Sequence, residues 1–445
     1  MTQERVPRIL IVGGGYVGMY TALRLQKKLR RSNVRITVVD PRSYMTYQPF
    51  LPEAAAGSLE PRHVIVPLRR TLKHCQVITG RVTRISHADR TAHVEPHVGE
   101  PYDMSYDVLV IAVGSIARTL PIPGLAEFGI GFKQVEEAIA MRNHVLDRLD
   151  VAASTANEDA RRRALSFVVV GGGYAGVEAL AELQDMAVDA LRYYPYIKRE
   201  HMRWVLVEAA NRILPEVGEE MGRYTVDELR RHGIDVRLNT RLESCIGGHV
   251  VLSDGTEFDS DTLIWTAGVK ANPMLANTDL PLDDRGRVCC HPSLRVQGID
   301  DAWAAGDCAA IPDLTADDPN ALTSPSAQHA VRQAKRLGDN IVAVLKGREP
   351  VDYAHKHVGS VASLGLHKGV AQVYGVKLKG WLAWFMHRTY HVSRMPTLNR
   401  KTRIVLDWTL ALFFRREVVS LGRIHMPHEE FRAAAVPPAG DEQRP

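Results

Sequence analysis

The chain has 445 residues, of which 45% are hydrophobic and 24% charged, and its formal net charge at pH 7 is +5. This is long enough for two or three domains with the composition of a soluble globular protein. The five cysteines show no C-x-x-C spacing, which argues against a disulfide framework or a zinc site, and no apolar run of 18 residues predicts a transmembrane helix.

The first predicted element is a strand over residues 8–12 that runs into a glycine-rich turn. The turn carries three glycines at G-x-G-x-x-G spacing: Gly13, Gly15 and Gly18. Between a strand and a helix, here expected over 16–30, this spacing indicates a dinucleotide whose pyrophosphate lies at the helix N-terminus. A second strand over 34–39 ends at Asp40, where a carboxylate can accept a hydrogen bond from a ribose hydroxyl.

The next stretch leads to a module boundary. The aromatic and proline-rich loop 44–53 has no clear period, and short strand and helix pieces are expected over 64–72 and 76–85. A buried strand that begins near residue 106 ends in a small-residue turn that contains Gly114, which permits close approach of a ligand or of a returning chain. Pro121 to Gly124 then punctuates the chain.

The second module repeats the first. Helices are expected over 134–150 and roughly 176–200, around a strand and a second glycine set at the same spacing: Gly171, Gly173 and Gly176. A strand over 204–207 ends at Glu208, the counterpart of Asp40. A glutamate there accepts from both ribose hydroxyls and repels a 2′-phosphate, which predicts NAD(H) rather than NADP(H). Arg212 is a weak counter-signal.

The remaining elements complete the second plan and return to the first. Strands over 234–238, 249–252 and 257–258 predict a β-meander. A strand from 262 then ends in a turn with Gly268, as the earlier strand ends at Gly114. The last strand ends at Gly306 and Asp307, where a carboxylate can accept from a polyol chain, and a helix is expected to about residue 346. Two complete fingerprints indicate two bound dinucleotides.

Aromatic and basic residues gather over 376–425. Trp381, Trp384, Phe385 and Arg388 have helical spacing and predict one aromatic face, and residues 404–414 form an almost apolar helix that is too short to span a bilayer. This combination is typical of a helix that lies in an anionic membrane interface, with packing on the core or a dimer face as the alternatives. The basic excess is thus explained without nucleic acid, and the pair His387 and His391 has no third metal ligand, so no metal is expected.

Together these features resemble the flavin-dependent pyridine-nucleotide disulfide reductase plan. Within it, four stretches resemble the type II NADH:quinone oxidoreductases: residues 48–51, 171–178, 265–271 and 327–328. The resemblance covers about residues 8–415 and is specific in combination. It implies an α/β fold with two Rossmann-type dinucleotide-binding domains, for FAD and NADH, and a C-terminal amphipathic helical membrane-binding segment. The expected divisions are 1–120 and 276–375 (FAD), 121–275 (NADH), 376–425 (membrane segment) and 426–445 (disordered tail).

The resemblance also implies roles for individual residues. The residues expected to bind non-covalent FAD and NADH are Gly13, Gly15, Gly18, Asp40, Val82, Gly114, Gly306 and Asp307, with Gly171, Gly173, Gly176, Glu208 and Gly268. Glu178 is expected beside the nicotinamide and flavin, and Gln328 at the quinone. The other expected quinone-site residues are Gln48, His329 and Lys368. Departures from the family pattern occur at Glu53 and Arg332, both in the expected quinone pocket.

The expected activity is that of a peripheral respiratory enzyme on the cytoplasmic face of the cell membrane. It would oxidise NADH by hydride transfer to FAD and pass two electrons to menaquinone or ubiquinone without pumping protons. The sequence leaves open whether the protein forms a homodimer. Three other functions are alternatives. A sulfide:quinone oxidoreductase needs paired reactive cysteines, whereas Cys289 and Cys290 are adjacent, and a disulfide reductase needs C-x-x-x-x-C, which residues 44–53 lack. The third is an FAD- and NADH-binding redox sensor.

Overall fold

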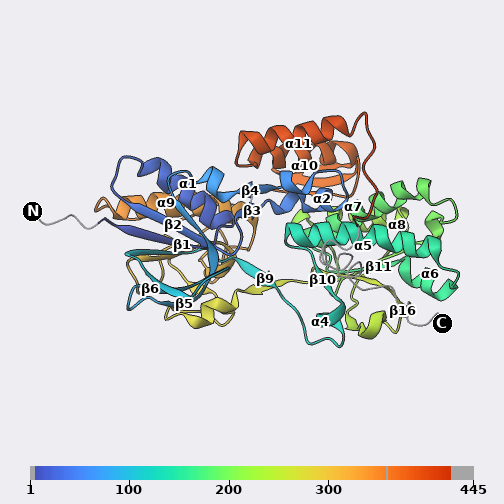
Figure 1. Cartoon of the computed structure of the whole chain (residues 1–445), viewed down its shortest axis with the longest axis horizontal. Helices are drawn as coiled ribbons and strands as arrows, with labels where there is room; N and C mark the ends of the chain where they lie inside the picture. The colour runs from blue at the N-terminus through green and yellow to red at the C-terminus, as the bar shows by residue number, and fades with distance from the viewer. Residues whose placement is uncertain (1–5, 357–358, 422–445) are drawn as a thin grey trace, which may run out of the picture.

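The computed structural model describes residues 6–356 and 359–421, so the expected tail over 426–445 and the end of the 376–425 segment lie outside the described residues. Figure 1 shows two α/β units side by side, with the C-terminal helices lying along one edge. The α/β class and the two Rossmann-type units are confirmed.

The first unit is built on a sheet with strand order β20-β8-β1-β2-β5-β6-β7. Its central strand β1 (Arg8–Val12) is buried from Ile9 to Val12, as expected of a parallel sheet covered on both faces. The other strands are β2 (Arg35–Asp40), β5 (Gln76–Ser86), β6 (Thr91–Pro96), β7 (Tyr102–Ser105), β8 (Val108–Ile111) and β20 (Ala302–Ala304). Because β20 pairs in parallel with β8, the chain returns to its first sheet after building the second unit. Helices α1 (Tyr16–Lys28) and α9 (Ala327–Val344) pack together beside this sheet.

The second unit has strand order β10-β17-β11-β12-β13, all parallel. Its strands are β10 (Ile130–Gly131), β11 (Ser166–Val170), β12 (Arg203–Val207), β13 (Ile234–Arg237) and β17 (Thr262–Trp265). Its helices are α4 (Leu125–Phe128), α5 (Val135–Ser154), α6 (Glu158–Ala164), α7 (Tyr174–Ala190) and α8 (Glu219–Arg231). An antiparallel pair, β9 (Ser115–Ala117) with β18 (Val269–Ala271), bridges the two units.

Two expectations for this unit were wrong. The strand at 234–237 joins the parallel sheet as β13, and the meander consists of β14 (Leu242–Ser244), β15 (His249–Leu252) and β16 (Glu257–Asp259). The helix expected to about residue 200 ends at Ala190 and continues only as short 3-10 turns, η3 (Leu191–Tyr193) and η4 (Arg199–His201). Pro195 lies between these turns, and a proline cannot extend a helix.

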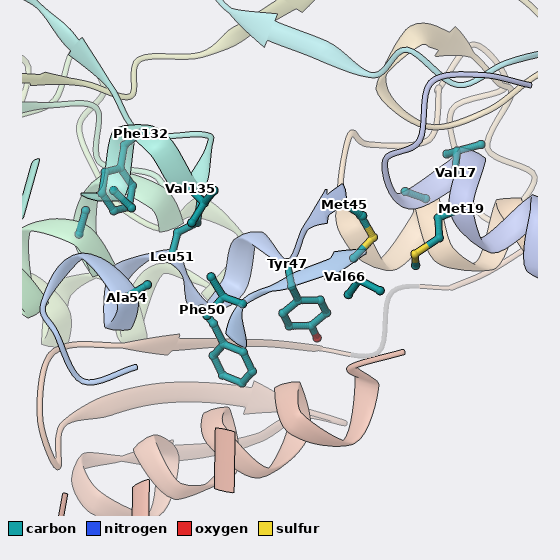
Figure 2. Packing of buried hydrophobic residues seen from close by; sticks show 14 of the residues in the cluster. Val17, Met19, Met45, Tyr47, Phe50, Leu51, Ala54, Val66, Phe132 and Val135 are labelled. Carbon is teal, nitrogen blue, oxygen red and sulfur yellow. The ribbon is translucent and has the colours of Figure 1, made fainter. Parts of the chain in front are cut away.

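Short elements lie between the longer ones. They are β3 (Tyr44–Thr46), η1 (Gln48–Phe50), α2 (Leu51–Ala55), η2 (Pro61–His63), β4 (Ile65–Pro67), α3 (Leu68–Thr71), η5 (Pro215–Val217), η6 (Ile246–Gly248), η7 (Pro273–Asn277), β19 (Val288–Cys289), η8 (Gly306–Cys308) and β21 (Ala309–Ala310). Figure 2 shows side chains of the loop after β3 between those of α1 and those that begin α5. Tyr47, Phe50 and Leu51 are all buried, so the aperiodic loop is part of the core.

The C-terminal part begins with an antiparallel sheet of order β22-β23-β24, made of β22 (Gly359–Ser363), β23 (Gly369–Val373) and β24 (Val376–Lys379). Helices α10 (Gly380–Arg394) and α11 (Leu398–Leu410) follow. The predicted helix 404–414 was therefore wrong in its bounds, because α11 starts at a Thr397 cap whose side chain accepts from the Arg400 N–H. Among the described helices, none is long and apolar enough to cross a membrane.

Candidate active site

The two glycine turns have the same geometry in both units. A Cβ added to Gly18 would collide with the carbonyl oxygen of Gly13, and one added to Gly176 with that of Gly171, so helix and strand approach too closely for any side chain. In contrast, no described atom lies within 4 Å of a Cβ added to Gly15 or Gly173. The middle glycine of each turn therefore faces open space, which is where a pyrophosphate would lie.

The two acids that end the second strands brace these turns. Asp40 Oδ2 accepts from the Gly14 N–H at 2.6 Å, and Glu208 Oε2 accepts from the Gly172 N–H, also at 2.6 Å. Burial raises the pKa of Asp40, against the hydrogen bonds from the Gly14 and Arg42 N–H groups. The sequence predicted a ribose contact for both acids, but it did not predict that each also accepts a hydrogen bond from the glycine turn. The remaining lone pairs of each carboxylate still allow a ribose contact.

A polar chain joins the units just beyond the ends of β8, β10 and β20. The Ser115 hydroxyl donates to Asp307 Oδ2 at 2.6 Å, and Lys133 Nζ donates to the Ser115 carbonyl at 2.5 Å and to its hydroxyl at 2.7 Å. Burial lowers the pKa of Lys133, while the Asp307 and Glu137 carboxylates oppose that shift. A cavity of about 560 Å³ beside this chain is lined by residues of both units, among them Arg118, Lys270 and Gly306.

These residues fit a flavin dinucleotide. Besides Gly15, the turn at Gly114 faces open space, and the buried Tyr16 hydroxyl has no hydrogen-bond partner among residues 6–356 and 359–421. Asp307 lies at the cavity, where an acceptor for polyol hydroxyls is needed. Val82 is buried in β5, the neighbour of β2 in the sheet. In the second unit, Gly268 and Gly173 face open space in the same way.

Glu178 lies in the first turns of α7 and is almost completely buried. Its Oε1 accepts from the Ser363 N–H at 2.8 Å and lies 3.1 Å from His387 Nε2. Burial lowers the pKa of His387, but Glu178, and more weakly Glu53 and Glu182, raise it above its ordinary value overall. Sequence reasoning considered His387 only as half of a metal pair with His391. No local pattern pointed to its ion pair with a residue of α7.

The residues expected at the quinone do not all gather at one place. Gln328 Nε2 donates to the Gly359 carbonyl at 3.1 Å, and its Oε1 is buried with no hydrogen-bond partner in the described structure. Gln48 Nε2 donates to the Lys133 carbonyl at 3.3 Å, which ties loop 48–50 to the junction. Lys368 instead lies at the opposite end of the β22–β23 hairpin from Gly359, 3.3 Å from Asp185.

His329, another residue expected at the quinone, is buried. It is 5% exposed, and its Nδ1 lies 2.8 Å from the Tyr353 hydroxyl. Arg332 NH1 donates to the Gln328 carbonyl one turn back, while Gln333 accepts from the Gly306 N–H at 2.8 Å. Gln333 thus supports the Gly306-Asp307 turn, a contact that the sequence did not predict.

The aromatic face expected on α10 is split. Trp381 and Phe385 are exposed, at 53% and 49%, whereas Trp384 is buried and the Arg388 side chain is only 12% exposed. Arg388 pairs with the buried Glu53 at 2.9 Å, and Trp408 Nε1 of α11 donates to the same Glu53 oxygen at 2.8 Å. The guanidinium also lies over the Trp384 and Trp408 rings. The departure at Glu53 therefore anchors both C-terminal helices.

The outer side of these helices is apolar with basic residues among it. Its exposed apolar residues are Trp381, Leu382, Phe385, Leu398, Val405, Leu406, Leu410, Leu412, Phe413 and Phe414, here called the outer apolar surface. Arg394, Arg403 and Arg415 are exposed on the same segment.

The cysteines do not form a thiol site. All five are free, and none is bonded to another. Burial raises the pKa of Cys289 and raises that of Cys290 well above its usual value, so both are held as thiols. The arrangement gives no support to the sulfide-oxidising alternative.

Comparison with known proteins agrees with this geometry. The model of the pyridine nucleotide-disulphide oxidoreductase family matches residues 7–334. A type II NADH:quinone oxidoreductase of Staphylococcus haemolyticus is 31% identical over 87% of this chain and 94% of its own, and a probable NADH dehydrogenase of Dictyostelium discoideum is 29% identical over 93% and 91%. The solved structure of NDH2 from Plasmodium falciparum in complex with NADH has a TM-score of 0.87 at 20% identity, over 93% of this chain and 100% of that one.

Proposed function

This chain belongs to the type II NADH:quinone oxidoreductases, within the pyridine nucleotide-disulphide oxidoreductase family, and we propose that it works as one with the residues described above. It is an FAD-dependent enzyme that oxidises NADH and reduces a quinone. The observation that carries the proposal is the pair of equivalent glycine turns, each with an open middle glycine and a bracing acid. The first turn holds FAD and the second holds NADH.

When bound, FAD accepts the hydride of NADH and delivers two electrons to the quinone. The chain's own residues bind and orient. Gly173 leaves room for the NADH pyrophosphate, Glu208 accepts from its ribose hydroxyls, and Asp307 accepts from the polyol chain of FAD. Holding both ligands at the junction turns the reaction between them into an intramolecular one, which is the main contribution that a protein makes to hydride transfer.

Quinone access is assigned to the side of Gln328 and Gln48. The buried Gln328 Oε1 without a described partner supports this, because an amide oxygen in that state is unfavourable unless a ligand satisfies it. We also propose that the domains divide at residues 120, 275 and 375, that the protein forms a homodimer, and that it lies on the cytoplasmic face of the membrane.

The membrane is the proposed source of the quinone. The outer apolar surface of α10 and α11, with its exposed arginines, has the composition of a monotopic interface. A lipid-soluble acceptor would reach the enzyme from that side.

A steady-state assay with quinone in lipid vesicles tests the proposal. The wild type is expected to oxidise NADH much faster than NADPH, and only when the vesicles contain quinone. Gln328→Ala should lower kcat/KM for quinone by about tenfold, the loss of one or two hydrogen bonds, and leave NADH reduction of the flavin unchanged. Equal quinone turnover in the variant would remove Gln328 from the site, and absence of any bound flavin would contradict the whole assignment.

A further inference from the structure

Acidic residues form a stripe along one face of α7. Their spacings of four, three and four residues place Glu178, Glu182, Asp185 and Asp189 on the same side of the helix. The stripe runs from the surface inward, since the Asp185 and Asp189 side chains are 21% and 27% exposed, whereas Glu182 is 1% exposed. Of these four acids, only Glu178 at the inner end was expected beside the nicotinamide and flavin.

Glu182 is held next to Glu178 by one serine. The Ser363 hydroxyl donates to Glu182 Oε1 at 3.0 Å, and the Ser363 N–H donates to Glu178 Oε1 at 2.8 Å. On the outer side, Asp185 accepts from the Leu366 N–H at 2.6 Å and contacts Lys368. The turn that links β22 to β23 therefore contacts three successive acids of the stripe.

The surrounding charges do not neutralise Glu182. The charged and titratable groups that face it are Glu53 of α2, Glu178 and Asp185 of α7, His387 and Arg388 of α10, and Arg416. Arg388 is engaged by Glu53, His387 by Glu178, and Arg416 lies 3.7 Å from Asp189. Within the described ranges, Glu182 makes no ion pair of its own. Burial, followed by the charges of Glu53 and Asp185, raises the pKa of Glu182 to about 7.

The overall reaction needs a proton from the protein side. NADH, one proton and a quinone give NAD⁺ and a quinol, so the hydride brings one hydrogen and the solvent must supply the other. This inference rests on the proposed function. We propose that Glu182 is a positioning residue that stores the second proton behind the Glu178–His387 pair and is reloaded from solvent at the Asp185–Lys368 end.

The proton balance is simple. The Glu178–His387 pair gives up a proton as an O–H bond forms on the quinone oxygen, the O–H bond of protonated Glu182 then breaks and returns a proton to the pair, and the Glu182 carboxylate takes up a proton from solvent. No further oxidant or reductant is involved. Because Glu182 acts through Glu178 and His387, its removal should affect the quinone half-reaction and its pH dependence, not the binding of NADH.

Anaerobic stopped-flow absorbance on the intact flavoprotein tests this. Glu182→Gln keeps the acceptor for Ser363 but cannot store a proton. Its flavin should be reduced by NADH at the wild-type rate and reoxidised by a short-chain quinone at least about tenfold more slowly at pH 6.5, less than the loss expected for a direct acid. The wild-type reoxidation rate should fall as pH rises through about 7, and the variant's should not. Asp189→Asn, at the exposed end of the stripe, is the matched control and should behave as wild type.

Ser363→Ala gives an independent test if Glu182→Gln does not fold. It removes the hydroxyl donor to Glu182 and keeps the N–H donor to Glu178, so it should move the fall in rate to higher pH, because a lost hydrogen bond to a carboxylate raises its pKa. Reoxidation of Glu182→Gln within about twofold of wild type with the same pH limb, or an unmoved limb in Ser363→Ala, would overturn the inference. A wild type that quinone cannot reoxidise would instead overturn the proposed function.

Discussion

At the scale of single residues, the acid that follows the second strand of each unit braces the glycine turn, in addition to the ribose contact that we propose for it. Asp40 and Glu208 each accept the N–H of the glycine that precedes the open one, so each carboxylate fixes the shape of the space that a pyrophosphate enters. We propose that Glu208 repels a 2′-phosphate by its charge, and its hydrogen bond from the Gly172 N–H holds that charge in place before the ligand binds.

Glu208→Gln is expected to weaken this discrimination. The amide oxygen can still accept from the Gly172 N–H, but the negative charge that repels a 2′-phosphate is lost. We expect kcat/KM for NADH to fall by about tenfold, the value of a hydrogen bond to a charged group, and that for NADPH to rise. Steady-state rates with both nucleotides measure the ratio. Arg212→Ala, at an exposed position four residues on, is the control, and an unchanged ratio in Glu208→Gln would contradict the role of Glu208.

Residue roles were predictable from the sequence only where all the interacting residues belong to one recognisable motif. The glycines and their acids are of that kind. Lys133, Gln333 and Ser363 were not found, because each acts through a partner that lies far away in sequence: Ser115, Gly306 and Glu178. Nothing in the residues around them distinguishes these three residues from ordinary polar residues on the surface.

At the scale of elements, α2 connects the C-terminal helices to the body of the protein. Glu53 on α2 accepts from Arg388 of α10 and Trp408 of α11, and His63 of η2 lies 2.6 Å from Asp407 of α11. Phe50 packs edge-on against Trp408, with ring centroids 5.7 Å apart. The loop that resisted sequence interpretation is therefore the platform for α10 and α11.

Glu53→Gln should weaken the attachment of α10 and α11 to α2. It leaves the buried Arg388 guanidinium without its carboxylate, and breaking a buried pair costs about 3–5 kcal/mol. We expect a clearly lower Tm by calorimetry. The double variant Glu53→Gln with Arg388→Met should recover part of that loss, because no unpaired charge remains. If Tm is the same in the wild type and in Glu53→Gln, the pair does not anchor the helices.

The outer apolar surface makes a separate prediction. Trp381→Ser with Phe385→Ser removes exposed aromatic area from α10, and we expect binding to anionic vesicles in a sedimentation assay to weaken by at least about tenfold. Turnover with a water-soluble quinone should be unchanged. Val98→Ser with Tyr102→Ser is the matched control, because both residues are exposed and lie in or just before β7, the edge strand of the first sheet. Equal vesicle binding by both double variants would exclude α10 as the contact.

Element boundaries were predicted less well than element types. The sequence places a strand near 234, but only the tertiary structure decides that it extends the parallel sheet and not the meander. On α10, helical spacing suggested one aromatic face, whereas burial of Glu53 draws Arg388 and Trp384 inward and leaves Trp381 and Phe385 outside. Periodicity identifies the residues that share a helix face, and the elements that pack against the helix determine which of these residues are exposed.

At the scale of the whole molecule, two copies of one device are arranged around a shared junction. The repeated glycine turns predicted this duplication from sequence. The junction itself was not predictable, since it is made by Ser115, Lys133 and Asp307, which come from three distant parts of the chain.

The buried acids give the whole molecule a pH-dependent stability. Because the folded-state pKa of Glu182 is raised to about 7, the folded chain holds a proton that the unfolded chain loses at lower pH, so this group's contribution falls as pH rises from about 4.5 to 7. Glu182→Gln should therefore show a smaller loss of Tm than the wild type across that range. Parallel Tm curves for the two proteins would indicate that Glu182 is ionised throughout.

The central claim is that one chain binds FAD at its first glycine turn and NADH at its second, and that NADH and a quinone react in turn with the one flavin. Anaerobic stopped-flow absorbance of the purified protein with NADH, and then with a short-chain quinone, tests it most directly. We predict rapid bleaching of the flavin band by NADH, slow bleaching by NADPH, and recovery of the band on addition of quinone. Bleaching without recovery, or a protein that binds no flavin, would contradict it.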